Sequence, residues 1–216
     1  SDNLEEKLSS IREIGINITD NKSLVKDSDI IVLSVKPNNI KNVIEEAEPF
    51  FNEKKLLVSI AAGISTEAIE FFLGNTPVPV IRIMPNLNVK VNAGLLPYCL
   101  GKYATGHNKV IEKTFSFSGF VFELKEEKFD SITAISGSGP GFIFFIAEII
   151  ETICKSKNFT PEEADLISAH IIYGSGKMLI DTKVPPQTLR EMVSSPGGTT
   201  LAGLNVFMEK GLKSIF

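Results

Sequence analysis

The sequence predicts an α/β domain built on an open, mostly parallel sheet, followed by an all-helical domain. Up to residue 124, short β-branched runs alternate with helical patterns, which is typical of parallel strands joined by helices. After the charged stretch 125–128, every apolar pattern has helical spacing. We therefore expect two domains, 1–124 and 125–216.

Five strands are expected in the first domain. The runs 29–35 and 55–60 are nearly continuous apolar stretches, which is typical of strands buried on both faces. Ser65 and Gly74 stand where a helix over 66–73 needs an N-cap and a stop. The remaining strands are expected at 78–83, 95–98 and 120–124, with further helices at 4–14 and 39–51. Ligands of such sheets bind at the carboxyl ends of the strands.

The second domain is expected to contain four helices, at about 140–156, 161–180, 187–193 and 200–210. Between Phe142 and Ile153 the first of them is apolar on every side. Such a helix is buried either in a large core or by a second subunit. A helical domain of fewer than 100 residues favours the second subunit, so we expect a homodimer.

Composition excludes several classes of protein. The chain of 216 residues is 43% hydrophobic and carries a net charge of −4 without a basic cluster, which argues against a nucleic-acid partner. Its two cysteines, Cys99 and Cys154, lack C-x-x-C spacing, so we expect reduced thiols in the cytoplasm and no metal site. The longest apolar run, 142–150, is interrupted by Glu148 and is too short to span a bilayer, so no membrane is expected.

Two glycine-rich runs stand out, at 136–141 (SGSGPG) and 193–200 (VSSPGGTT). Each is expected to be a turn that opens a helix. The first N–H groups of a helix lack internal partners and carry partial positive charge, so two such turns could hold a small carboxylate or phosphate. The alternative for the second run is an ordinary helix start capped by a threonine. Gly197 and Gly198 exceed what that cap requires.

Three further turns follow consecutive predicted strands: Val35-Lys36-Pro37, Ala61-Ala62-Gly63 and Met84-Pro85-Asn86. Small residues after a strand let a flat ring approach the backbone, and Asn86 offers an amide to a ligand. Taken singly, each could be an ordinary turn after a strand. Three such turns at one sheet edge predict a ligand site.

Together with residues 130–134 (DSITA), the two glycine-rich runs resemble the signature of pyrroline-5-carboxylate reductases. The stretches 31–37, 57–64 and 82–86 match that family in the same order, and Leu189-Arg190 precedes the second run at the usual distance. The resemblance implies a Rossmann-like domain without its first βα unit, followed by a helical dimerisation domain. It implies NADPH- or NADH-dependent reduction of 1-pyrroline-5-carboxylate to L-proline by a homodimer or a ring of dimers.

The resemblance also assigns roles to individual residues. Thr200 falls where the family hydrogen-bonds the ring nitrogen, which makes it the catalytic candidate. The expected cofactor-binding residues are Val35, Lys36, Pro37, Ala61, Ala62, Gly63, Met84, Pro85 and Asn86. The expected substrate-binding residues are Ser138, Gly139, Pro140, Ser195, Gly197, Gly198, Thr199, Thr200 and again Asn86.

One departure from the family concerns the start of the chain. The family begins with a strand, a G-x-G-x-x-G turn and a helix, about 30 residues that hold the pyrophosphate. We expect the protein to carry this segment ahead of Ser1, because the strand near 30–35 tolerates an open edge badly. Without it the chain is expected to bind dinucleotide poorly. Asp2 would disfavour a 2′-phosphate, whereas Ser1 and Asn3 would tolerate one, so NADP and NAD both remain open.

Two alternatives are kept. A related reductase of a hydroxy acid would need a catalytic lysine in the helical domain, for which Lys177 is the candidate; otherwise Lys177 is a solvated helix residue. A non-catalytic dimeric module would keep the fold and lose coenzyme binding. The histidines do not favour either alternative, because His107 lies in a polar loop and His170 is expected to be a structural residue within a helix.

Overall fold

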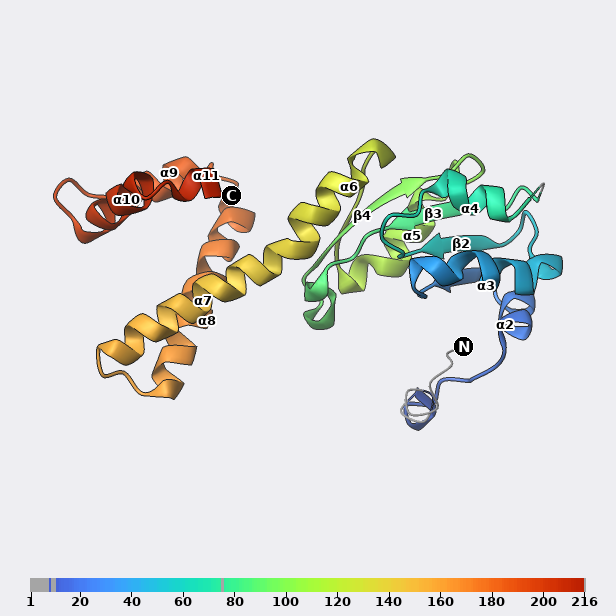
Figure 1. The fold of residues 1–216 in the computed structure, drawn as a ribbon, viewed down its shortest axis with the longest axis horizontal. Coiled ribbons are helices and arrows are strands. Elements are labelled where there is room, and N and C mark those ends of the chain that lie inside the picture. The colour runs from blue at the N-terminus through green and yellow to red at the C-terminus, as the bar shows by residue number, and fades with distance from the viewer. Residues whose placement is uncertain (1–7, 9–10, 75, 216) are drawn as a thin grey trace. The chain divides into compact units, whose positions relative to one another are not determined.

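The structure is a computed structural model that describes residues 8, 11–74 and 76–215 (Figure 1). The chain forms two compact units, Ser1–Gly141 and Phe142–Phe216, and each is considered by itself. The predicted helix over 4–14 and the residues Ser1, Asp2 and Asn3 lie mostly or wholly outside the described residues.

A five-stranded sheet forms the centre of the first unit, in the order β1-β2-β3-β4-β5. Parallel pairing joins β1 to β2, β2 to β3 and β4 to β5, whereas β3 and β4 are antiparallel. The strands are β1 (Ile30–Leu33), β2 (Leu56–Ser59), β3 (Val80–Ile83), β4 (Gly94–Leu100) and β5 (Gly119–Glu123). The expected open, mostly parallel sheet is confirmed.

Helices cover both faces of this sheet. On one face, α2 (Asn21–Asp27), α3 (Ile40–Ala47) and α4 (Thr66–Phe72) pack over alternate strand residues such as Leu57 and Val80. On the other face, α5 (Asn108–Phe115) packs over the residues between them. Ser65 caps α4 as predicted, because its Oγ accepts from the N–H of Ala68 at 3.1 Å.

The first strand differs from its prediction. Burial on both faces holds for β2, whose four residues are all buried, but Val32 in β1 is 44% exposed. The apolar cluster under α5 is centred on β2, β3 and β4 and takes in only Ile30 of β1. Within the part of the chain that the structure describes, β1 pairs only with β2. The apolar run therefore predicted the strand correctly but not the cover over its second face.

The four helices expected after residue 125 are confirmed. They are α7 (Ser138–Ser156), α8 (Pro161–Thr182), α9 (Pro186–Met192) and α10 (Thr199–Glu209), followed by a short α11 (Leu212–Ile215). A capping box begins α8, in which Thr160 Oγ1 accepts from the Glu163 N–H and the Glu163 carboxylate accepts from the Thr160 N–H.

The first glycine-rich run is not a turn at a helix start, which corrects our expectation. Helical backbone runs without a break from α6 (Phe129–Ile132) through a π-helical turn (Thr133–Gly137) into α7. The amide of Pro140 has no proton for the carbonyl four residues earlier, and its ring would clash with that carbonyl in a regular helix. A π-helical turn just before the proline widens the helix at this point.

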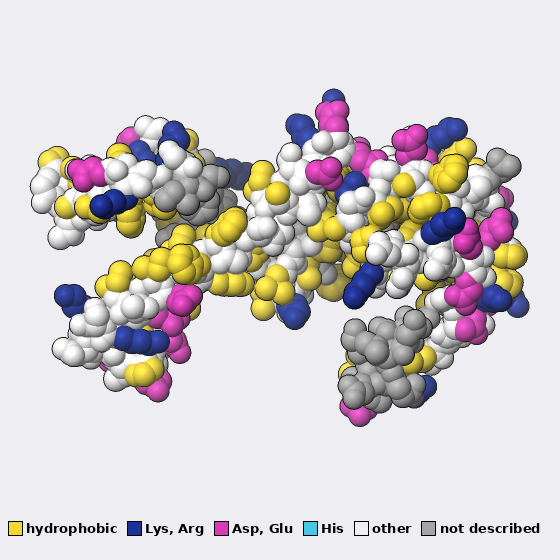
Figure 2. Space-filling model, in the orientation of Figure 1, with side chains coloured by type: hydrophobic (Ala, Val, Ile, Leu, Met, Phe, Trp, Pro, Cys, Tyr) yellow, Lys and Arg dark blue, Asp and Glu magenta, His cyan; other side chains and the backbone are white. Residues whose placement is uncertain are grey.

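The apolar residues of α7 are largely exposed in the single chain. Phe144 and Phe145 are 55% and 61% exposed, and Figure 2 shows hydrophobic side chains gathered along this helix. By length and composition, the continuous helix Glu126–Ser156 would be long and apolar enough to cross a membrane, although the run 142–150 alone is too short. A helix covered by a second subunit has the same composition.

Candidate functional site

The three predicted turns lie at one edge of the sheet. Strands β1, β2 and β3 run parallel, and their register pairs Leu33 with Ser59 and Ser59 with Arg82. The segments that follow these strands, 34–37, 60–63 and 84–86, therefore leave the sheet side by side at its carboxyl edge. Ligands of open α/β sheets bind at this edge.

The first two turns expose the groups that a ligand would meet. Lys36 and Pro37 are exposed, as are Ala62 and Gly63, whereas Ala61 is buried beneath them. Gly63 has φ +74°, a left-handed conformation that side chains rarely adopt, and no atom lies within 4 Å of where a Cβ would stand. The second turn thus presents bare backbone.

Asn86 in the third turn already joins two parts of the unit. Its Oδ1 accepts from the N–H of Leu95 at 3.1 Å, and its Nδ2 donates to the carbonyl of Ser136 at 3.3 Å. Ser136 is four residues before Pro140, so its carbonyl is the one that the proline cannot serve. Asn86 therefore holds the helix at the first glycine-rich run beside the carboxyl edge of the sheet.

The first glycine-rich run presents a helix surface of small residues. Ser138 is exposed and Pro140 is buried, and a Cβ added to Gly137, Gly139 or Gly141 would meet nothing within 4 Å. Because the run lies inside a continuous helix, it has no free helix N-terminus to attract an anion. What remains for a ligand is the Ser138 hydroxyl and close approach to the helix backbone.

The second run is a turn at a helix start, as predicted. The N–H of Gly198 donates to the carbonyl of Ser195 at 2.9 Å, with Pro196 and Gly197 between them and Gly197 at φ +73°. Proline followed by a left-handed glycine is the pattern of a type II turn. Gly198 is the N-cap residue of α10 and supplies no side-chain acceptor, so the alternative of a threonine cap is wrong. Thr199 and Thr200 are exposed in the first turn of the helix.

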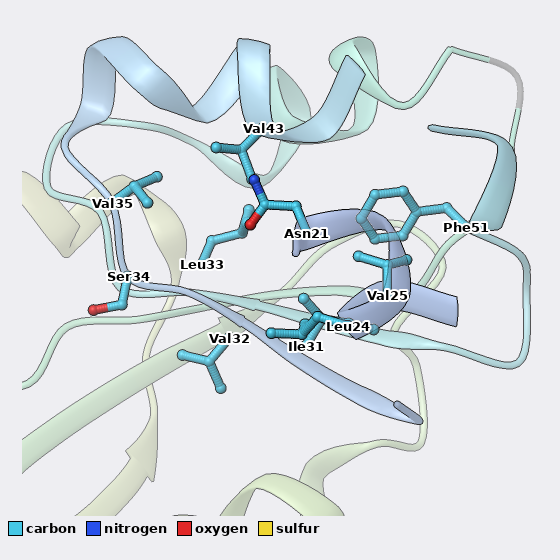
Figure 3. A pocket seen from close by; sticks show the side chains of 10 residues that line it. All are labelled: Asn21, Leu24, Val25, Ile31, Val32, Leu33, Ser34, Val35, Val43 and Phe51. Carbon is cyan, nitrogen blue, oxygen red and sulfur yellow. The ribbon is translucent and has the colours of Figure 1, made fainter. Parts of the chain in front are cut away.

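Two cavities lie near these segments. One of about 90 Å³ is lined by Phe51 and by side chains of α2, β1 and α3, and it reaches Ser34 and Val35, at the start of the first turn (Figure 3). It is far smaller than the roughly 300–1,000 Å³ of ligand pockets. The other, of about 360 Å³, lies between α8 and α9 and includes Arg190, ahead of the second run, and Val193, its first residue.

Sequence reasoning missed a buried polar cluster under the third turn. Arg82 in β3 is 4% exposed, and its Nη1 lies 3.3 Å from Oε1 of Glu126. The same carboxylate accepts from the backbone N–H of Thr66 at 2.8 Å and from its hydroxyl at 2.6 Å. These contacts join residues 44 and 60 positions apart, so no local pattern could reveal them.

The remaining candidates are placed as follows. Lys177 is exposed on α8 and paired with Asp181, which raises the pKa of the lysine through a hydrogen bond and through charge. It is a solvated helix residue, as expected. His170 is exposed rather than packed in a core, so the expectation that it is a structural residue is wrong for the single chain. Among the described residues there is no cluster of three metal-ligating side chains.

Comparison with known proteins places both parts of the chain. Residues 126–216 match the family model for pyrroline-5-carboxylate reductase dimerisation, and residues 1–63 match the model for coenzyme F420-dependent NADP oxidoreductases. The pyrroline-5-carboxylate reductase of Aquifex aeolicus is 33% identical over 99% of this chain and 80% of its own length. Reductase 1 of Bacillus subtilis is 32% identical over 88% of this chain and 64% of its own length.

Solved structures agree with these sequence matches. The pyrroline-5-carboxylate reductase of Coxiella burnetii superposes with a TM-score of 0.87 and 31% identity, over 98% of this chain and 80% of that one. The Plasmodium falciparum pyrroline carboxylate reductase with NADP bound gives a TM-score of 0.83 and 29% identity, over 92% and 75%.

Fold and site define a two-domain dinucleotide oxidoreductase, with a Rossmann-like sheet domain and a helical dimerisation domain. Within that class, the chain belongs to the pyrroline-5-carboxylate reductase family.

Proposed function

We propose that this protein reduces 1-pyrroline-5-carboxylate to L-proline with NADPH or NADH, the last step of proline biosynthesis. The observation that carries the proposal is the match to pyrroline-5-carboxylate reductases over 99% of the chain, through both compact units. The turns at the carboxyl edge of β1, β2 and β3 are where such a fold takes its coenzyme.

The residues at this edge fit a nicotinamide coenzyme. Ala62 and Gly63 present backbone without bulk, and the Val35-Lys36-Pro37 and Met84-Pro85-Asn86 turns flank them. When bound, the coenzyme supplies the hydride. The chain then has mainly to position the substrate, because a protonated cyclic imine is already electrophilic.

The second glycine-rich run suits the substrate. The backbone N–H groups that open α10 face no capping side chain, so they remain for the carboxylate of an imino acid. The proposed carboxylate site is formed by Ser195, Gly197, Gly198 and Thr199. The Thr200 hydroxyl would hydrogen-bond the ring nitrogen. We propose that Ser138, Gly139 and Pro140 also bind substrate, through a hydroxyl and an open helix surface rather than through a second helix N-terminus.

We also infer that the working form is a homodimer or a ring of dimers in the cytoplasm. Support comes from the dimerisation-family match over 126–216, from the exposed phenylalanines of α7, and from two cysteines that are both free. The same apolar helix is then covered by a second copy of the chain rather than by lipid.

Assays of the purified protein, expressed from its whole gene, test the activity. We expect oxidation of NADPH or NADH with 1-pyrroline-5-carboxylate and none with the keto-acid precursors of hydroxy acids. Turnover with the keto acids alone would favour the hydroxy-acid reductase. No turnover with either substrate, by a protein that still forms a dimer, would favour the non-catalytic module.

A further inference from the structure

The buried Arg82–Glu126 pair lies among the segments that form the proposed site without being one of them. Arg82 is two residues before Met84, and Thr66 is the first residue of α4, three residues after Gly63. Glu126 begins the helical stretch that leads to the first glycine-rich run. One carboxylate therefore ties two of the coenzyme-side turns to the substrate-side helix.

The environment of the guanidinium makes this tie specific. Arg82 lies over the ring of Phe129, 4.6 Å from its centroid, and Phe129 is fully buried. The Nη2 atom of Arg82 lies 3.9 Å from the exposed carboxylate of Asp130, which is too far for a hydrogen bond. The Nε atom of Arg82 has no hydrogen-bond partner in the structure. Glu126 is thus the main neutralising partner of a buried cation. Breaking such a pair from one side is far more disruptive than its presence is stabilising.

The helical stretch has a second anchor about ten residues further on. There Asn86 donates to the carbonyl of Ser136, just before Ser138 and Pro140. Two fixed points separated by about 15 Å of helix determine both the position and the rotation of the segment between them. A shift at the Glu126 end would therefore move the Ser138 end relative to the Met84–Asn86 turn.

We propose that Glu126 is a positioning residue of the imino-acid site. By bridging Thr66 and Arg82, its carboxylate fixes the Ser138–Pro140 segment beside the Met84–Asn86 turn, so that substrate and coenzyme meet in reactive geometry. Glu126 itself contacts neither molecule. This inference rests on the proposed reductase function and adds to it a determinant outside the glycine-rich runs.

Three variants test the proposal. Glu126→Gln removes the charge that faces Arg82. Thr66→Val removes only the hydroxyl that donates to Glu126, and it keeps the shape and the Arg82–Glu126 pair. Glu127→Gln, at an exposed carboxylate in the same short helical turn, is the matched control. For each variant, kcat and KM are measured well below its unfolding temperature, alongside the Kd of NADPH.

For the folded Glu126→Gln protein we expect kcat/KM for 1-pyrroline-5-carboxylate to fall about tenfold or more, because small misplacements of reacting groups are costly. In Thr66→Val, kcat/KM should also fall, but by less, and in Glu127→Gln it should equal that of the parent protein. The Kd of NADPH should change less than threefold in all three proteins. A merely structural role would lower the unfolding temperature and leave the kcat and KM of the folded protein unchanged.

Amide hydrogen exchange supplies a readout that does not need activity. Peptides covering 133–141 should exchange faster in Glu126→Gln and Thr66→Val than in the parent, because the segment has lost one anchor. If these peptides exchange at the rate of the parent and kcat/KM of the variants stays within twofold of the parent, the proposal is overturned. If Glu126→Gln does not fold, the measurements on Thr66→Val alone decide. If the parent protein does not reduce the imine at all, the proposed function fails, and the exchange experiment still tests the anchor.

Discussion

The residues proposed for binding and positioning differ in how firmly the chain holds them. Asn86 is fixed by two backbone contacts, and Arg82 by one carboxylate and one aromatic ring. Thr200, by contrast, lies exposed in the first turn of a helix whose N-cap is a glycine. Asn86 and Arg82 are thus held in place by the protein, whereas the Thr200 hydroxyl is exposed and available to a ligand.

Replacing Thr200 by Ala should reduce kcat for 1-pyrroline-5-carboxylate about tenfold or more, because a hydrogen bond to the reacting ring is lost. Since Gly198 rather than Thr200 is the N-cap residue, the free energy of unfolding should change little. Steady-state kinetics and urea unfolding measure the two effects.

The control is Thr160→Ala, which breaks the capping box of α8 and lies in neither glycine-rich run. It should lower the free energy of unfolding by about 1 kcal/mol and leave kcat unchanged. An unchanged kcat in Thr200→Ala would rule out the assigned role.

Cys99 should make the fold sensitive to alkali. Burial, with the Glu126 carboxylate adding to it, raises the pKa of this thiol to about 12. In the unfolded chain the thiol loses its proton near pH 8.5, so the unfolded state is favoured progressively between about pH 8.5 and 12. A Cys99→Ala variant should show a shallower loss of the free energy of unfolding over that range. Equal slopes in parent and variant would contradict the argument.

At the scale of elements, features that depend on neighbouring residues could be predicted from the sequence, whereas features that depend on residues far apart in the chain could not. The five strands and most of the helices were predicted because their apolar periodicity and caps are local, as the Ser65 cap of α4 illustrates. The helices α2 and α5 were not predicted. The π-helical turn was missed because glycine and proline together are typical of turns. The hydrogen bond from Asn86 to the Ser136 carbonyl joins residues 50 positions apart, so no local pattern could reveal it. The Arg82–Glu126 pair was missed because its partners are 44 residues apart.

The turn before α10 offers a test with matched glycines. Gly197 has φ +73°, so Gly197→Ala should strain the turn, costing on the order of 1 kcal/mol, and should raise KM for the imino acid. Gly174 lies within α8 with open space at its Cβ position, so Gly174→Ala should instead stabilise the protein by about 0.5–1 kcal/mol and leave KM unchanged. Urea unfolding and substrate titrations distinguish the two. If both substitutions had the same effect, the left-handed turn would not matter to the site.

At the scale of the whole molecule, the exposed apolar side chains of α7 support the proposed assembly. Fully burying a phenylalanine is worth about 1.5–3 kcal/mol, and several such residues on this helix are more than half exposed in one chain. The sequence predicted a helix without a polar face, and in the single chain many of its apolar side chains are exposed. It could not indicate which of these side chains a second copy covers, because that depends on contacts between chains.

Light scattering should therefore find a dimer or a multiple of dimers at micromolar protein concentration. Placing a charge on α7, as in Phe145→Glu, should shift the protein towards monomers or abolish folding. The same substitution type at Phe117, an exposed residue in the first unit, should leave the assembly intact. A stable, folded monomer of the parent chain would contradict the proposed assembly.

The π-helical turn at Thr133–Gly137 has a consequence for sequence evolution. Such a turn holds one residue more than an α-helical turn, and each residue added to or removed from a helix rotates everything beyond it by about 100°. A deletion there would rotate Ser138 relative to the anchor at Glu126 while leaving the amino-acid composition almost unaltered. Active relatives should consequently keep a constant number of residues between Glu126 and Pro140. Insertions or deletions between Glu126 and Pro140, rather than substitutions there, would then identify relatives that have lost the activity.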